Sequence, residues 1–225
     1  MKKLGIGQIL YFIWLTLGIS LSIVLAGFSA ENITRLLVIG FILLQIALRS
    51  ILVKAFPQLP HKTRFIVLAT FLAAVVEGFH MISMPVFLSL RIGRDTSIMG
   101  GLIQYGIDLA FTLPAYLIIF SVIWYFINRF YFRFWPYVFV MGLAQTLGDG
   151  GLFFFLNAPA MLFFLPYPMT NYHAINIIPF LAVREHLKQE RSVSFLSYLA
   201  VPAVITTYLI CGAIIKVLGR FLGLE

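Results

Sequence analysis

The stretch LGIGQILYFIWLTLGISLSIVLAGF, residues 4–28, contains no charged side chain. A helix of about 20 apolar residues crosses the roughly 30 Å hydrocarbon core of a bilayer. Lys2 and Lys3 before the stretch, and small residues near Ala30 after it, resemble a signal peptide. Its apolar core is longer than the roughly 7–15 residues of a cleaved signal. We therefore predict an uncleaved first membrane span at 5–27.

The rest of the chain has the same character. Of its 225 residues, 61% are hydrophobic and 11% are charged, against roughly 25% charged in soluble domains. Because backbone groups in hydrocarbon must be satisfied internally, such runs form helices. The sequence predicts an all-α, polytopic membrane protein forming one domain, 1–225, with about seven spans or, at the lower count, six. They lie near 5–27, 34–55, 65–90, 98–127, 134–157, 160–183 and 196–219.

The net charge of +8 is divided among short patches between the apolar runs, which is typical of cytoplasmic loops facing anionic lipid. We therefore expect membrane lipids as partners and no nucleic acid. With the N-terminus inside, most basic residues fall in inner loops, and Arg91 and Arg94 are the main outer exceptions. This favours an N-in, C-out topology. The patches comprise Lys2, Lys3, Lys54, Lys62, Arg64, Arg129, Arg133, Arg184, Lys188 and Arg191.

The sixth predicted span is irregular because it contains Pro159, Pro166, Pro168 and Pro179. Proline inside a helix removes a hydrogen bond and kinks or ends the helix. The sequence therefore predicts a broken or re-entrant segment near 157–170. The run GDGG at 148–151 predicts a second irregularity late in the fifth span.

Four consecutive spans carry polar residues at helical spacing. VVEGFHMISMPVF, 75–87, places Glu77 and His80 one turn apart, at the predicted centre of the third span. Residues three or four apart share a helix face, and at 1.5 Å per residue the acids and imidazoles fall in the middle or outer half of the bilayer. The later spans contribute Gln104, Asp108 and Thr112, then Gln145 and Asp149, then Asn171, His173 and Asn176.

Ionisable groups inside a membrane are costly and usually functional. We expect Glu77, His80 and Asp108 to be catalytic, with Glu77 as acid/base and His80 as its partner. Gln104, Gln145, Asn171 and Asn176 are candidate substrate-binding residues. Structural explanations stand beside these: a Glu77–His80 pair tying helices together, or a capping role for Asp149.

A divalent metal is an open alternative. His80, His173 and Asp149 offer nitrogen and oxygen ligands suited to Zn, Fe or Mn, although their spacing matches no strong motif. Without a metal, a Glu–His pair in a low-dielectric setting can exchange protons.

These patterns lead us to expect a buried Glu/His/Asp site acting on a small hydrophobic, lipid-like or isoprenoid-like substrate by acid–base or metal-assisted chemistry. A proton-coupled transporter is the first alternative, since carriers also combine buried acids with broken helices. A pigment-binding or structural subunit of a membrane complex is the second. We expect a multi-pass protein of a prokaryotic cell (inner) membrane, either as a homo-oligomer or within a complex.

Overall fold

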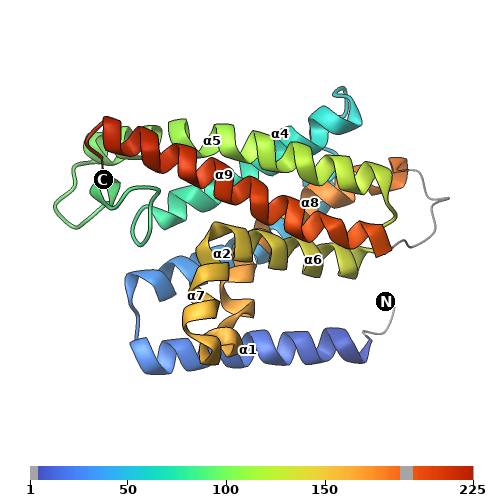
Figure 1. Ribbon diagram of the computed structural model, residues 1–225, viewed down its shortest axis with the longest axis horizontal. Helices are drawn as coiled ribbons and strands as arrows, with labels where there is room; N and C mark the ends of the chain where they lie inside the picture. Colours follow the sequence, from blue (N-terminus) through green and yellow to red (C-terminus); the bar gives the residue numbers. More distant parts are fainter. Residues whose placement is uncertain (1–4, 188–194, 225) are drawn as a thin grey trace.

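The computed structural model describes residues 5–187 and 195–224, and within them every regular element is helical. The long helices run roughly along the longest axis of the molecule, with the start of α1 and the end of α9 at opposite ends (Figure 1). Lys2, Lys3, Lys188 and Arg191, four residues of the predicted basic patches, lie outside the described residues.

Six helices in the described part of the chain are long and apolar enough to span a membrane, which indicates a multi-pass membrane protein. The structure thus gives six candidate spans rather than seven, because the predicted sixth span at 160–183 is not among them. The six are α1 (Ile6–Ala26), α2 (Ala30–Ala47), α4 (His61–His80), α5 (Ile98–Arg129), the combined segment Phe134–Asn157, and Phe195–Phe221, which contains α9 (Ala200–Phe221).

The segment missing from that set contains the central helix of the protein. Helix α8 (Pro166–Val183) packs against α2, α4 and α6 (Phe134–Thr146). Fourteen of its 18 residues are buried. Its polar side chains lower its hydropathy, and the surrounding helices separate it from lipid.

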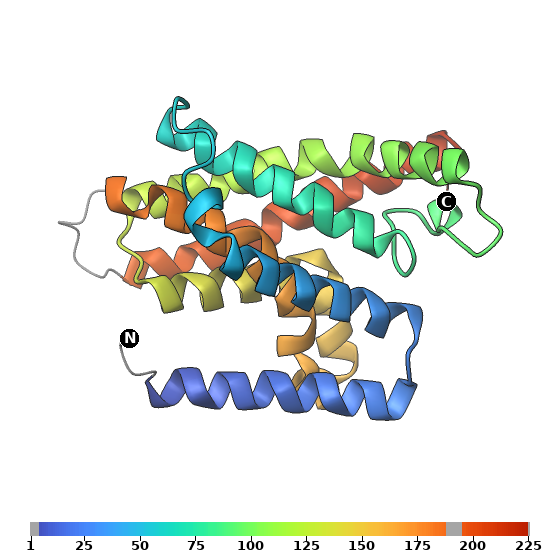
Figure 2. The ribbon, with the colours of Figure 1, turned by 180° about the vertical axis from the view of Figure 1, so that it is seen from behind.

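The chain between α6 and α8 is interrupted twice. After α6, a π-helical turn at Leu147–Gly151 contains two non-helical residues, Asp149 and Gly150, the latter with φ of 91°. Helix α7 (Leu152–Asn157) and the 3-10 helix η3 (Pro159–Phe164) follow. These short helices run across the bundle direction towards α1 (Figure 2). Helix α7 therefore ends, and α8 begins, within the interval 157–170 in which a break was predicted.

The third predicted span ends earlier than the sequence suggests. Helix α4 ends at His80, and residues 81–97 form a loop that contains the 3-10 helix η1 (Leu88–Leu90). VVEGFHMISMPVF is therefore a helix end, not a helix centre. Pro85 explains why the helix does not continue past Met81, because its ring lacks an N–H and clashes with the carbonyl four residues earlier. The loop buries Met81, Phe87 and Leu90 against partly buried side chains of α5 and α9.

Shorter elements complete the end of the molecule at which α1 begins. Helix α3 (Arg49–Leu52) follows α2, and the 3-10 helices η4 (Arg184–His186) and η5 (Phe195–Leu199) precede α9. Arg64, expected in a basic loop patch, is buried and donates hydrogen bonds to the carbonyl oxygens of Ala55 and Val53. That arginine ties α4 to the chain after α3.

Candidate functional site

Four of the predicted site residues, Glu77, Asp149, His80 and Asn171, belong to two neighbouring clusters. We define the acid–tyrosine cluster as Glu77, Tyr116, Asp149, Tyr172 and Tyr208. We define the arginine cluster as Arg35, His80, Thr170 and Asn171. Helices α4 and α8 each contribute to both, since Glu77 and His80 are one turn apart and Asn171 precedes Tyr172.

The acid–tyrosine cluster contains two carboxyl–phenol hydrogen bonds. The Tyr116 hydroxyl on α5 donates to Oε1 of Glu77 at 2.5 Å. The Tyr172 hydroxyl on α8 donates to Oδ2 of Asp149, also at 2.5 Å. Each acid is thus held by a phenol from another helix.

Two buried amide side chains, Gln145 and Asn176, form hydrogen bonds next to these pairs. Gln145 donates to the Tyr208 hydroxyl at 3.1 Å, and its Oε1 accepts a hydrogen bond from Asn176. Asn176 also donates to the carbonyl oxygen of Tyr172, and its Oδ1 accepts from Tyr137 at 3.0 Å. Gln145 and Asn176 are wholly buried. Both were predicted to bind substrate, and the structure shows them engaged with protein groups.

The break after α6 brings these groups together. Gln145 and Asp149 are four residues apart, and the non-helical backbone at Asp149 and Gly150 ends the helix beside α9. A Cβ added to Gly148 would lie 2.7 Å from Cβ of Tyr208, closer than real side chains pack. Glycine at 148 therefore allows α9, and with it the Tyr208 hydroxyl, to approach the turn.

Three acids interact electrostatically in this region. Glu77 experiences the charges of both Asp108 and Asp149. Like charges repel strongly where water is scarce, so a bound proton or cation lowers the energy of the group. Side-chain exposure leaves the group accessible, because Glu77 is half-buried and Asp149 is exposed at its turn.

Asp108 was predicted to be catalytic, and the structure places it against the loop that precedes α5. It is wholly buried, and its Oδ1 accepts a hydrogen bond from the backbone N–H of Val86 at 2.7 Å. This bond anchors the 81–97 loop to α5. Its Oδ2 is buried without a partner, as is Oε1 of Gln104 one turn earlier. Thr112 donates to the backbone carbonyl of Asp108.

The arginine cluster contains a residue that the sequence analysis did not single out. Arg35 lies in the second turn of α2, within the predicted span 34–55, and is 3% exposed. Its Nη1 donates to Oγ1 of Thr170 at 2.8 Å and to Oδ1 of Asn171 at 2.5 Å. The guanidinium also lies 4.3 Å from the ring centre of Tyr167. A charge inside an apolar run was the available signal.

The three tentative metal ligands do not form a ligand group. His173 Nε2 shares a 2.5 Å hydrogen bond with the Tyr11 hydroxyl of α1, whereas Asp149 pairs with Tyr172. His80 experiences the positive charge of Arg35, which disfavours a cation beside it. Nowhere in 5–187 or 195–224 do three His, Cys, Asp or Glu side chains gather with metal-binding geometry. The predicted Zn, Fe or Mn site is thus not assembled by these residues.

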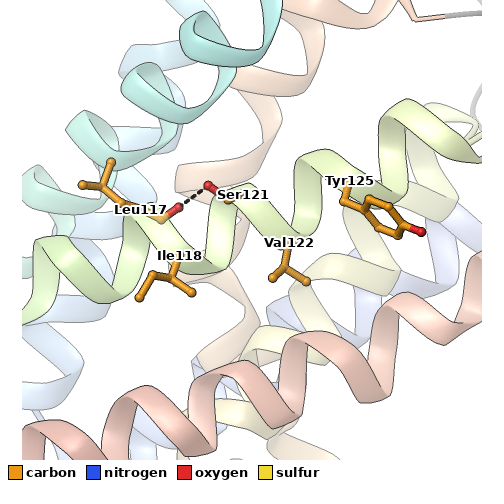
Figure 3. A pocket seen from close by; sticks show the side chains of 5 residues that line it. All are labelled: Leu117, Ile118, Ser121, Val122 and Tyr125. Atoms are coloured by element: carbon orange, nitrogen blue, oxygen red, sulfur yellow. Dashed lines mark hydrogen bonds between the residues drawn. The ribbon is translucent and has the colours of Figure 1, made fainter.

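A surface groove lies apart from both clusters. It runs along α5 and is lined by Leu117, Ile118, Ser121, Val122 and Tyr125 (Figure 3). The Ser121 hydroxyl donates to the carbonyl oxygen of Leu117 at 2.7 Å. The rest of the lining is largely apolar.

No protein-family model, curated protein or solved structure matches this chain. Function is therefore argued from the two clusters and their surroundings.

Proposed function

We propose that this protein carries out acid–base chemistry on a lipid-like or isoprenoid-like substrate at the acid–tyrosine cluster. The observation that carries the proposal is the pair of carboxyl–phenol hydrogen bonds, Glu77 with Tyr116 and Asp149 with Tyr172, the second of which lies at the break after α6. A metal-assisted reaction would need a ligand group that the described residues do not form, so we propose the metal-free form.

Glu77 is the proposed acid/base. Its carboxyl accepts a hydrogen bond from Tyr116 at one oxygen, which fixes its orientation and leaves the other oxygen to face a substrate. A general acid or base must lie within hydrogen-bond reach of the proton that it moves, and the half-buried position of Glu77 permits that. Asp149 and Tyr172 form the second pair, which orients the substrate or returns the proton.

The surroundings favour a substrate dissolved in the membrane. Asp149 is exposed at its turn, and the following residues of α7 expose large apolar side chains, with Phe153 and Phe154 at least half exposed. A hydrophobic molecule arriving from the bilayer would meet apolar surface first and the acid next. An ion arriving from water would find less favourable surroundings along that route.

The proposal includes a topology. Placing α1 in to out, with α6 and α8 as a hairpin interrupted by α7 and η3, gives the predicted N-in, C-out arrangement and a re-entrant segment near 157–170. It is supported by the opposite positions of the start of α1 and the end of α9 (Figure 1). The prokaryotic cell (inner) membrane expected from the sequence is also part of the proposal.

A proton-coupled carrier is a second candidate, favoured by one observation. The acid Asp149 sits at the non-helical joint between α6 and α7. Transporters commonly bind substrate and coupling ions at such discontinuous helices near mid-membrane.

The first test incubates the purified protein, in lipid nanodiscs, with a total lipid extract and follows lipid masses by liquid chromatography and mass spectrometry. We expect one lipid class to change mass or retention with wild type. Glu77→Gln should reduce the conversion at least a hundredfold, within the range attributed to general acid–base catalysis. The matched control is Glu185→Gln, which removes an exposed acid of η4 and should retain full conversion.

The second test separates the carrier from the enzyme. Wild type, Glu77→Gln and Asp149→Asn are reconstituted in vesicles loaded with a pH-sensitive dye and exposed to a library of small solutes. Solute-dependent proton uptake, without any altered lipid in the first test, would reject the enzyme in favour of the carrier. Lipid conversion without proton uptake would do the opposite.

A further inference from the structure

The buried position of Arg35 requires an explanation that its protein partners do not supply. Its guanidinium is always charged, and it is 3% exposed in the second turn of a helix that is apolar enough to span the membrane. A buried charge is usually paired with an opposite charge. Both hydrogen-bond acceptors of Arg35, Thr170 and Asn171, are neutral.

The nearest acid on the same helix does not remove the difficulty. Glu31 lies one turn before Arg35 and interacts with it electrostatically, but Glu31 is exposed on the surface of α2. The ring of Tyr167 contributes a cation–π contact. Both interactions are weaker than a direct ion pair with hydrogen bonds.

Unused donors converge at the same place. Nε of Arg35 is buried and has no hydrogen-bond partner within the described residues. Nε2 of His80 is also buried without a partner among the described residues. The same imidazole hydrogen-bonds the side chain of Asn171 and lies near the charge of Arg35. Because Oδ1 of Asn171 accepts from Arg35, its amide nitrogen is left as a donor. The imidazole can donate when Nε2 carries its proton.

We propose that the arginine cluster binds an oxyanion, a phosphate or a carboxylate, and that this oxyanion is the headgroup of the lipid-like substrate. A guanidinium fork matches two oxygens of either group, and the unused donors of His80 and Asn171 would complete the shell. The inference rests on the proposed function. It adds the polar end of the substrate to a site whose reactive end is Glu77.

The spacing of the two clusters suits a substrate whose headgroup lies in one and whose reacting carbons lie in the other. Glu77 and His80 are three residues apart on α4, which corresponds to a rise of about 5 Å. A headgroup held beside His80 and Arg35 would therefore place the first carbons of its chain near Glu77. Asn171 and Tyr172, consecutive on α8, make the same connection from the other side.

Binding is tested without turnover, by thermal unfolding of the delipidated protein in a neutral detergent. The probes are dioleoyl phosphatidic acid, oleic acid, dioleoylglycerol and inorganic phosphate. We expect phosphatidic acid or oleic acid to raise the melting temperature of wild type, whereas dioleoylglycerol does not. Arg35→Gln should weaken the apparent affinity at least tenfold. Arg94→Gln, which removes an exposed arginine from the 81–97 loop, should bind like wild type.

Two further arms keep the result interpretable. If Arg35→Gln does not elute as a folded species, His80→Ala provides the same test, because it removes the unpartnered Nε2 and loses only the hydrogen bond to Asn171. An equal shift with inorganic phosphate would support the oxyanion site but assign it to a free anion. Equal shifts in wild type and both variants, or an equal shift with dioleoylglycerol, would overturn the inference.

The failure of this inference and that of the proposed function are distinguishable. Glu77→Gln should bind the anionic lipid and lose conversion, since it lies outside the arginine cluster. Anionic binding with no conversion in any protein would leave the oxyanion site standing and reject the acid–base reaction. Conversion that continues when no probe binds would reject the oxyanion site alone.

Discussion

Helices α1 and α8 are opposites in composition and position. Helix α1 is the most apolar candidate span, with a mean hydropathy of 2.3, and Gly18 is its one buried residue in a helix of 21. Helix α8 is shorter and too polar to count as a candidate span, yet 14 of its 18 residues are buried. The most hydrophobic helix lies at the edge of the molecule (Figure 2), and one of the most polar lies at its centre.

The difference follows from the solvent. Between helices in a bilayer there is no hydrophobic driving force, because lipid tails are as apolar as leucine. Association depends on packing and interhelical hydrogen bonds instead. Helix α8 supplies these through Asn176, Tyr172 and Thr170. Helix α1 also bonds other elements, through Tyr11, Trp14 and Ser22, but none of these three side chains is fully buried. Burial in this protein therefore marks hydrogen bonding and close packing, and the candidate site lies where they concentrate.

The largest effect on stability should come from Asn176→Leu in α8. This substitution removes hydrogen bonds to Gln145, Tyr137 and the backbone of Tyr172 and leaves the Tyr137 hydroxyl buried without its acceptor. Buried polar groups left unpaired cost about 1–3 kcal/mol each, less where membrane neighbours compensate, so we expect a loss of about 3 kcal/mol. Unfolding in mixed micelles with increasing dodecyl sulfate measures it.

The control for that experiment is Ile177→Leu, which conserves volume at the adjacent position of α8. It should change the free energy of unfolding by less than about 1.5 kcal/mol. An Asn176→Leu protein as stable as the control would mean that hydrogen bonds do not hold α8 in the centre.

Gly148→Ala should have the next largest effect, because it tests packing with no change in polarity. The added methyl would lie 2.7 Å from Cβ of Tyr208 and 3.1 Å from Cα of Ile205, so α9 must move away. Overpacking of this kind costs typically 1–3 kcal/mol, and we expect about 2 kcal/mol in the same assay. Gly212→Ala in α9, where a Cβ meets nothing within 4 Å, is the matched control and should not destabilise. Equal stability of the two variants would show that α9 does not depend on close approach at Gly148.

For the helices that face lipid, the sequence is a good predictor. The predicted spans 5–27 and 98–127 match α1 and α5 closely, because an uncharged run of sufficient length admits few alternatives to a helix. It predicts the interruptions through proline and glycine, which act on the backbone locally. The end of α4 at His80 was missed although Pro85 indicated it. The residues after His80 are apolar like those of a membrane span, but they form a folded loop.

The candidate site is less predictable for a physical reason. Helical spacing shows which polar residues share a face, so Glu77 with His80 and Gln145 with Asp149 were found. It does not show how neighbouring helices are rotated, and that rotation decides that tyrosines are the partners of both acids. Tyrosine is common at membrane interfaces, so its position carries little information. Arg35, by contrast, was a charge within a predicted span and was available to sequence reasoning.

A smaller effect is expected where α1 contacts α8. Tyr11→Phe removes the hydroxyl that bonds His173 Nε2 at 2.5 Å and keeps the ring that packs against His173 and Phe139. Single interhelical hydrogen bonds in membranes contribute about 0.6 kcal/mol on average, and we expect a loss of that size in the unfolding assay. Tyr125→Phe, which removes an exposed hydroxyl bonded to Arg129, is the control and should be neutral. A loss above about 2 kcal/mol would show that α1 is held as firmly as α8.

The smallest effect should come from the lipid-facing surface of α1. Val24 is 79% exposed, so its side chain meets lipid in the folded protein and again after unfolding in a micelle. Val24→Ala should therefore change the free energy of unfolding by less than about 0.5 kcal/mol. The matched substitution Val183→Ala in α8 deletes the same atoms from a wholly buried position and should cost about 2 kcal/mol by leaving a cavity. A loss above about 1 kcal/mol for Val24→Ala would mean that α1 is covered in the membrane by another protein surface, and the comparison with α8 would then hold only for the single chain.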